Sequence, residues 1–228
     1  MNFHYTNLDT CHAATGVVIV VDVLRAFSNA AYAFSRGAEK IILVGDVDEA
    51  LSLKSQIPNS KAMGEVGGLP PAGFDLGNSP TQILEHDLSG MTIIQRTGAG
   101  TQGAVRSKNA DLLLASSFVV AKATVKYINK LAPESVTFVI TGQYTPKHGD
   151  EDLAFAEYIE SLFKGKQPNG ESFIKRVFKS RDAIQHLDPE EIGFPLSDLD
   201  LCTYINAFDF AMPVTKENNL LVMRKTKI

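Results

Sequence analysis

The chain has 228 residues, of which 44% are hydrophobic and 21% charged, with a formal net charge of −4. These values are typical of one large globular domain, or of a domain with an extension, and they argue against a broad basic surface for nucleic acid. The only two cysteines, Cys11 and Cys202, lie far apart, which argues against a disulfide scaffold and a zinc finger. The N-terminal residues lack a signal-peptide pattern, and the longest apolar run, Val17–Val21, is too short to span a bilayer. We therefore expect a cytoplasmic protein without nucleic-acid or membrane partners.

Apolar runs of strand length alternate with helix-length segments through the first two thirds of the chain. Strands are expected at Val17–Val21, Lys40–Val44, Ala62–Gly64, Met91–Gln95, Asp111–Ala115 and Ser135–Thr141. Helices are expected at Leu24–Arg36, from Asp46 to about Gln56, and in segments that end near Lys108, Leu131 and Phe163. This alternation predicts an α/β fold with three layers, α/β/α, and a mainly parallel sheet.

The pattern changes after residue 165. Residues 166–206 are more charged and mostly helical in pattern, whereas Phe210–Val214 and Leu220–Met223 predict a β-hairpin that joins an edge of the sheet antiparallel to it. We predict an α/β core over residues 1–165 and an extension over 166–228 packed on it, with a single domain 1–228 as the alternative. The apolar residues of the extension could instead form a homodimer interface.

Ligands of parallel sheets bind beyond the carboxyl ends of the strands. After the first predicted strand come Asp22 and then Arg25 and Ser28, which lie in or near the first turn of a helix. The amino end of a helix suits a phosphate, and an arginine adds a bidentate donor. A plain helix cap beside a surface arginine is the alternative interpretation.

A second candidate is the turn RTGAGT at residues 96–101, which opens another predicted helix. Its glycines let backbone N–H groups approach an oxyanion, although its spacing is not that of a Walker motif. An ordinary turn fits this stretch equally well.

Carboxylates form a third candidate set. Glu65 follows a short strand, and Asp75 lies in the glycine-rich loop GFDLGNSP at residues 73–80. Oxygen ligands of this kind suit Mg²⁺. Glu151 and Asp152 open a later helix, where acidic residues are also favoured by the helix dipole alone.

The order of these motifs resembles the ComB family of 2-phosphosulfolactate phosphatases. DVLRA at 22–26, Gly64-Glu65, Gly100-Thr101 and Glu151-Asp152 are similar to its short motifs, and GFDLGNSP matches its signature loop throughout. The resemblance extends from about residue 16 to 160, and the eight-residue loop is its most specific part.

The resemblance implies Mg²⁺-dependent hydrolysis of (R)-2-phospho-3-sulfolactate to 3-sulfolactate and phosphate, a step of coenzyme M or sulfolactate biosynthesis. It implies catalytic roles for Asp22, Arg25, Glu65, Asp75, Glu151 and Asp152, with metal ligation by Asp22, Glu65 and Asp75. Substrate contacts are implied for Ser28, Asn78, Ser79, Arg96, Thr97, Gly98, Gly100 and Thr101. The small anionic ester is thus the expected partner.

Three positions depart from the family pattern near the expected anion pocket. Val66 stands where many members carry arginine, Phe27 where a small hydroxyl residue is common, and Ala99 where asparagine is frequent. Two alternatives therefore stay open: a phosphatase for another 2-hydroxy-acid phosphate, and a catalytically silent protein that binds small anions.

Overall fold

The structure is a computed structural model that describes residues 1–142, 150–188 and 190–228. The strands are β1 (Asn2–Asn7), β2 (Val17–Val21), β3 (Lys40–Leu43), β4 (Ser60–Gly64), β5 (Thr92–Arg96), β6 (Leu112–Ser116), β7 (Ser135–Ile140), β8 (Phe210–Glu217), β9 (Leu220–Met223) and β10 (Thr226–Lys227). The α-helices are α1 (Ala26–Ser35), α2 (Val47–Gln56), α3 (Pro80–Ile83), α4 (Gly100–Arg106), α5 (Ala121–Asn129), α6 (Asp150–Phe163), α7 (Gly170–Val177), α8 (Arg181–Leu187) and α9 (Leu196–Thr203). Short 3₁₀ helices cover Cys11–Ala13 and Phe118–Val120. None of the helices within these ranges is long and apolar enough to cross a membrane.

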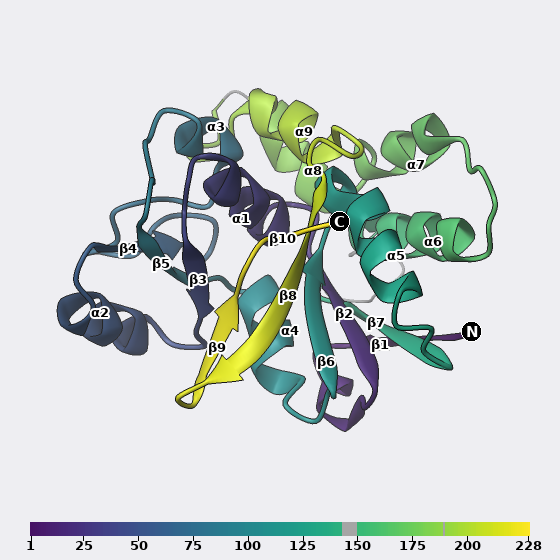
Figure 1. Ribbon diagram of the computed structural model, residues 1–228. Helices are drawn as coiled ribbons and strands as arrows, with labels where there is room; N and C mark the ends of the chain where they lie inside the picture. Colours follow the sequence, from purple (N-terminus) through teal and green to yellow (C-terminus); the bar gives the residue numbers. More distant parts are fainter. Residues whose placement is uncertain (143–149, 189) are drawn as a thin grey trace.

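One sheet runs through the molecule in the order β1-β7-β2-β6-β8-β9-β3-β5-β4, and β10 pairs with β8. Strands β1, β7, β2 and β6 form one parallel group, and β3, β5 and β4 form another. The hairpin β8–β9 joins the groups through antiparallel pairs with β6 and β3 (Figure 1). The predicted α/β fold with a mainly parallel, mixed sheet is therefore confirmed.

The hairpin was expected at an edge of the sheet, and this expectation is wrong. β8 and β9 lie in the middle of the sheet, and the Phe210–Val214 part of β8 is buried throughout. Pro213 lacks an N–H to donate, a feature that usually marks edge strands. The hairpin turn falls at Asn218 and Asn219, whose φ angles of 48° and 66° suit the twist of a tight hairpin.

Local sequence explains most of the other elements. The five residues of β2 are all buried, as expected for an uninterrupted β-branched run covered on both faces. Asp46 caps α2 by accepting hydrogen bonds from the N–H groups of Asp48 and Glu49. β1, which was not expected, is a polar, half-exposed strand that pairs with β7 at one edge of the sheet.

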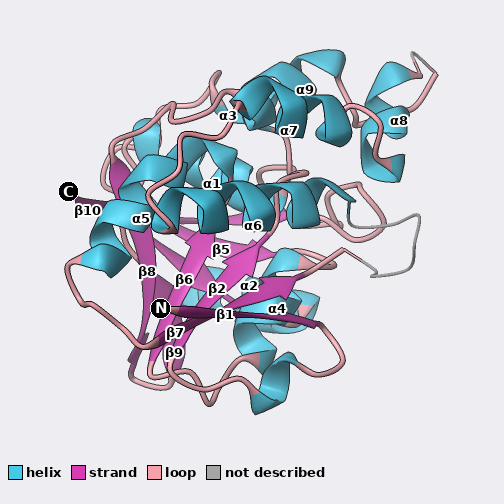
Figure 2. Cartoon of the chain, turned by 90° about the vertical axis from the view of Figure 1, so that its right-hand side faces the viewer, coloured by secondary structure: helices cyan, strands magenta, loops and turns pink. Residues whose placement is uncertain are grey.

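Helices cover both faces of the sheet. The side of β2 that carries Val18 and Val20 packs with α1 and α4, and the same core includes buried residues of β3, β5 and β8. The opposite side of β2 packs with α5 and α6, which run along one face of the sheet in Figure 2. Helix α2 covers the side of β3 and β5 that faces away from α1 and α4. The core on the side of α1 and α4 thus contains strands of both parallel groups.

The segment that follows β5 contacts the end of β2. A Cβ atom at Gly100, at the start of α4, would lie 2.6 Å from Oδ2 of Asp22, which follows β2. A Cβ atom at Gly103 would lie 2.6 Å from the Val20 side chain and 2.8 Å from that of Thr141. Only glycine at these positions lets α4 begin directly against the ends of β2 and β7.

Candidate active site

A cluster of buried carboxylates lies where these strands end. Asp22 follows β2, and Glu151 and Asp152 lie in the first turn of α6. Their exposed fractions are only 5%, 2% and 2%. Glu65, which follows β4, lies close enough to raise the pKa of Asp22. The structure thus brings together four of the carboxylates that the sequence selects.

Asp22 and Asp152 are fixed by backbone groups. Oδ1 of Asp22 accepts a hydrogen bond of 2.8 Å from the Ala26 N–H at the start of α1. Asp152 accepts from the Val23 N–H (2.8 Å), the Gly142 N–H (3.0 Å) and the Thr141 hydroxyl (3.2 Å). Asp152 therefore ties the end of β2 to the end of β7, and both of its oxygens are engaged.

Burial and like charge raise the pKa values of all three carboxyl groups. Burial, with a smaller effect from Glu65 and Glu151, raises the pKa of Asp22 to about 7 against the lowering effect of its bond from Ala26. Burial and then Asp22 raise the pKa of Asp152 to about 8. Burial and then Asp152 raise the pKa of Glu151 well above its ordinary range, and Oε2 of Glu151 is buried without a hydrogen-bond partner. Such unmatched buried carboxylates are typical of functional sites.

Glu65 is placed by the pairing of β4 with β5. Gly64 has a φ of 139°, and a Cβ atom there would lie 1.8 Å from the Arg96 carbonyl oxygen. The Glu65 N–H donates to that same oxygen at 3.0 Å. The Glu65 carboxylate accepts hydrogen bonds from the N–H groups of Gly98 and Gly68, so it is held between two glycine-rich turns.

The turn at residues 96–101 is tied to itself. The Thr97 N–H donates to the Thr101 hydroxyl oxygen at 2.8 Å, and the Thr101 N–H donates to the Thr97 hydroxyl oxygen at 3.1 Å. This reciprocal bonding fixes the start of α4. Arg96 donates to the carbonyls of Glu65 and Gly45, which places its guanidinium beside the Glu65 loop.

The signature loop has two ends with different surroundings. Asp75 accepts a hydrogen bond from the Ala62 N–H at 2.8 Å and forms an ion pair with Lys54. Although partial burial opposes it, the hydrogen bond from Lys54 lowers the pKa of Asp75. Ser79 caps α3, and Asn78 is buried with its Oδ1 atom unpaired. The structure therefore places Asp75 beside Lys54 and does not group it with Asp22.

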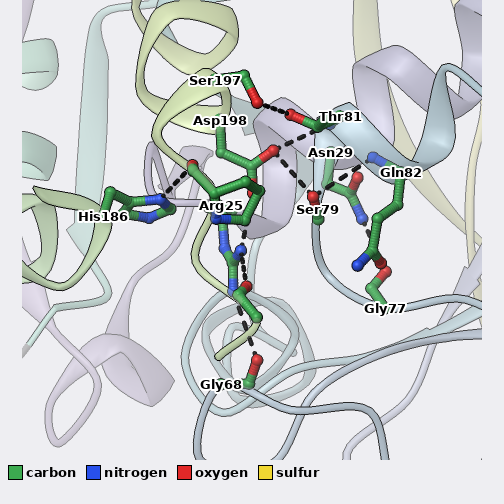
Figure 3. A network of polar contacts seen from close by, with 12 residues as sticks. Arg25, Asn29, Gly68, Gly77, Ser79, Thr81, Gln82, His186, Ser197 and Asp198 are labelled. Atoms are coloured by element: carbon green, nitrogen blue, oxygen red, sulfur yellow. Dashed lines mark hydrogen bonds and ion pairs between the residues drawn. The ribbon is translucent and has the colours of Figure 1, made fainter. Parts of the chain in front are cut away.

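Arg25 and Ser28 face the interior. The Ser28 hydroxyl is fully buried and donates to the Val23 carbonyl at 2.8 Å. Arg25 is 3% exposed and forms an ion pair of 2.8 Å with Asp198 of α9 (Figure 3). Their contacts with a substrate anion stay a prediction.

Two acidic residues of the C-terminal helices were not predicted as site residues from the sequence. Asp182 of α8 is close enough to raise the pKa of Asp22, Glu151 and Asp152. Asp198 is fully buried and binds Arg25. Both stand in helical segments without a motif, and their distance along the chain hides their place in the fold.

Within the described ranges, no three His, Cys, Asp or Glu side chains are grouped as a metal site would need. Asp22 is nevertheless surrounded by other carboxylates. Burial raises its pKa, and Glu65, Glu151 and Asp182 add to that effect. Carboxylate oxygens without a positive partner fit Mg²⁺, which takes one or two protein carboxylates and keeps several waters.

Comparison with known proteins identifies the family of the chain. The model of the 2-phosphosulpholactate phosphatase family matches residues 4–217. A probable 2-phosphosulfolactate phosphatase of Bacillus subtilis is 33% identical, over 95% of this chain and 94% of the relative. Relatives of the same name from Carboxydothermus hydrogenoformans and Thermus thermophilus are 32% and 33% identical, over 95% and 88% of this chain and 94% and 88% of their own. The chain therefore belongs to the 2-phosphosulfolactate phosphatase family, whose members hydrolyse a phosphate monoester.

Proposed function

We propose that the protein hydrolyses (R)-2-phospho-3-sulfolactate to 3-sulfolactate and phosphate with the help of Mg²⁺. Family membership supports the reaction class, and the relatives carry the name of this activity. The observation that carries the proposal is the buried cluster of Asp22, Glu151 and Asp152 beside the glycine-rich turn at 96–101. The product, 3-sulfolactate, would serve coenzyme M or sulfolactate biosynthesis.

The phosphoryl group needs donors for its oxygens. The N–H groups of Thr97, Gly98 and Thr101 already have partners, whereas those of Ala99 and Gly100 have none among the described residues. These two N–H groups, at the start of α4, suit an oxyanion. Arg96 uses only part of its five-donor guanidinium on Glu65 and Gly45, so it can bind a phosphate or sulfonate as well.

The leaving group is an alkoxide, which is poor unless it is protonated as the P–O bond breaks. Glu151 is suited to this step because burial raises its pKa, which favours the protonated acid, and its Oε2 atom has no hydrogen-bond partner. Asp152 accepts three hydrogen bonds, so we assign it the placement of Glu151 and of the ends of β2 and β7. Asp22 and Glu65 are assigned to the metal.

Mg²⁺ would be held by Asp22 and Glu65, whose carboxylates repel each other without a cation. When bound, it would neutralise charge on the phosphoryl oxygens. Asp75, also predicted as a ligand, already has a cationic partner in Lys54, so we propose that it shapes the loop.

A phosphatase for another 2-hydroxy-acid phosphate is the second candidate. Its support is Val66, whose side chain is 49% exposed directly after Glu65, where an arginine would add a cation to the site. A site without that cation has less attraction for a sulfonate.

Phosphate release with Mg²⁺ or with EDTA tests the proposed function. We expect release from 2-phospho-3-sulfolactate with Mg²⁺, none with EDTA, and a loss of about 100-fold or more in the Asp22→Asn variant. Release that persists in EDTA would refute the metal role. Equal activity of Asp22→Asn would point to a contaminating phosphatase. Phosphoglycolate and phospholactate, run in parallel, test the second candidate.

A further inference from the structure

A single buried carboxylate outside the carboxylate cluster joins three segments of the chain. Asp198, on α9, has an exposed fraction of 0%. Its Oδ2 atom accepts from Arg25 at 2.8 Å, and its Oδ1 atom accepts from the Ser79 hydroxyl and the Thr81 N–H, both at 2.9 Å. Figure 3 shows these groups converging on the Asp198 side chain. Asp198 therefore connects α9 to the chain just after Asp22 and to the signature loop.

The guanidinium of Arg25 continues this connection. It donates to the carbonyl of Gly193 at 2.7 Å and, at the longer distance of 3.4 Å, to the carbonyl of Gly68. The Phe194 ring covers it, with 4.5 Å between the ring centroid and Cζ of Arg25. The two carbonyl groups and the Phe194 ring thus fix the buried side chain of Arg25.

Gly68 links Arg25 to the site. Its carbonyl accepts from Arg25, and its N–H donates to Oε2 of Glu65 at 2.8 Å. A Cβ atom at Gly68 would lie 2.2 Å from the Phe194 ring, so the loop rests directly on that ring. A continuous series of contacts therefore leads from Asp198 through Arg25 and Gly68 to Glu65.

We propose that Asp198 is a positioning residue of the phosphatase site that acts through Arg25 and Gly68 on Glu65. This inference rests on the proposed function, in which Glu65 takes part. Arg25 is buried, so without the charge of Asp198 its guanidinium would lack a counter-charge in the interior and would reorient toward water. Gly68 would then lose its donor, and Glu65 would lose its fixed position between Gly68 and Gly98.

Asp198 also holds the signature loop through Ser79 and Thr81, so a purely structural role has to be separated from positioning. A structural role lowers stability and leaves the kinetic constants of the folded fraction unchanged. It also makes the effects of distant substitutions multiply independently. A positioning role instead makes the effect of Asp198 depend on whether Glu65 is present.

The test is a double-mutant cycle on kcat/KM, measured well below the Tm of each variant. Asp198→Asn should lower kcat/KM about 100-fold, because a displacement of about 1 Å at a catalytic group costs on that order. In a Glu65→Gln background the same change should cost less than about threefold, since its route of action is gone. Asp200→Asn is the matched control, because it removes the same charge from an exposed position of α9.

Two results of this cycle would overturn the inference. Fully multiplicative effects of Asp198→Asn and Glu65→Gln would show a structural role, as would an Asp198→Asn enzyme with the kinetics of Asp200→Asn. If Asp198→Asn does not fold, Arg25→Lys replaces it, because lysine keeps the charge but lacks the fork that reaches both Asp198 and Gly68. The same non-additivity with Glu65→Gln is then expected, and its absence refutes the inference. A wild-type protein without phosphatase activity would instead refute the proposed function, and the inference with it.

Discussion

Replacing Gly64 by alanine should damage both the fold and the site, because this glycine of β4 packs directly against the backbone of Arg96 in β5. Its φ of 139° is unfavourable for any residue with a side chain and costs about 1–3 kcal/mol. The new Cβ atom would lie 1.8 Å from the Arg96 carbonyl oxygen, a backbone atom that cannot rotate away. Relief of such a clash costs roughly another 1–3 kcal/mol. The expected loss in the free energy of unfolding is therefore about 2–6 kcal/mol.

The assay is urea denaturation followed by circular dichroism, with Gly90→Ala as the matched control. Gly90 also has a positive φ, of 69°, but a Cβ atom there would meet nothing within 4 Å. Its replacement should cost only about 1–2 kcal/mol. Equal losses in the two variants would refute the reasoning, because they would show that the contact with Arg96 carries no cost. Since β4 must move to relieve the contact, Glu65 should move as well, and Gly64→Ala should lose activity while Gly90→Ala keeps it.

Three further predictions follow from the fold and the charges. A chain that ends at residue 209 should fail to fold, because it lacks the β8–β9 hairpin in the middle of the sheet; a cooperative thermal transition of that fragment would contradict this. In EDTA, stability should fall as the pH rises from about 4 to about 7, because the raised pKa of Asp22 makes the folded state bind more protons than the unfolded state in this window. Asp22→Asn should flatten part of that fall, and an unchanged pH profile of the urea midpoint would count against the assignment. Asp75→Asn should cost about 1 kcal/mol, since it weakens a partly exposed ion pair with Lys54 and the bond from Ala62, and a Tm unchanged from wild type would show that these contacts are not stabilising.

The fold was predictable wherever local sequence dictates it. The apolar run of β2 and the Asp46 cap of α2 both specify their elements without tertiary information. The position of the terminal hairpin was not predictable, because the sequence of residues 210–223 does not indicate which strands flank it. Its neighbours, β6 and β3, lie far away in the sequence and run in opposite senses beside it. β1 was not predicted for a related reason: a polar edge strand lacks the apolar run by which the other strands are found.

The site divides in the same way. Asp22, Glu151 and Asp152 converge as the rule for parallel strands predicts, because each follows the end of a strand or opens the helix after one. Asp75 was selected by its motif, yet its neighbours are Lys54 and Ala62. Asp198 carries no local signal at all: two residues away, Asp200 has the same side chain on the same helix and is exposed. Only the packing of α9 against the signature loop distinguishes the two.

The comparison of two substrates tests the central claim most directly. 2-Phospho-3-sulfolactate and 2-phospholactate share the ester and the carboxylate, and they differ in a sulfonate that replaces a hydrogen of the methyl group. We predict a Mg²⁺-dependent kcat/KM at least about tenfold higher for the sulfonate, because one charge-assisted hydrogen bond is worth roughly 1.5–3 kcal/mol. Equal values for the two esters, or a preference for 2-phospholactate, would contradict the proposed substrate while leaving the phosphatase family in place.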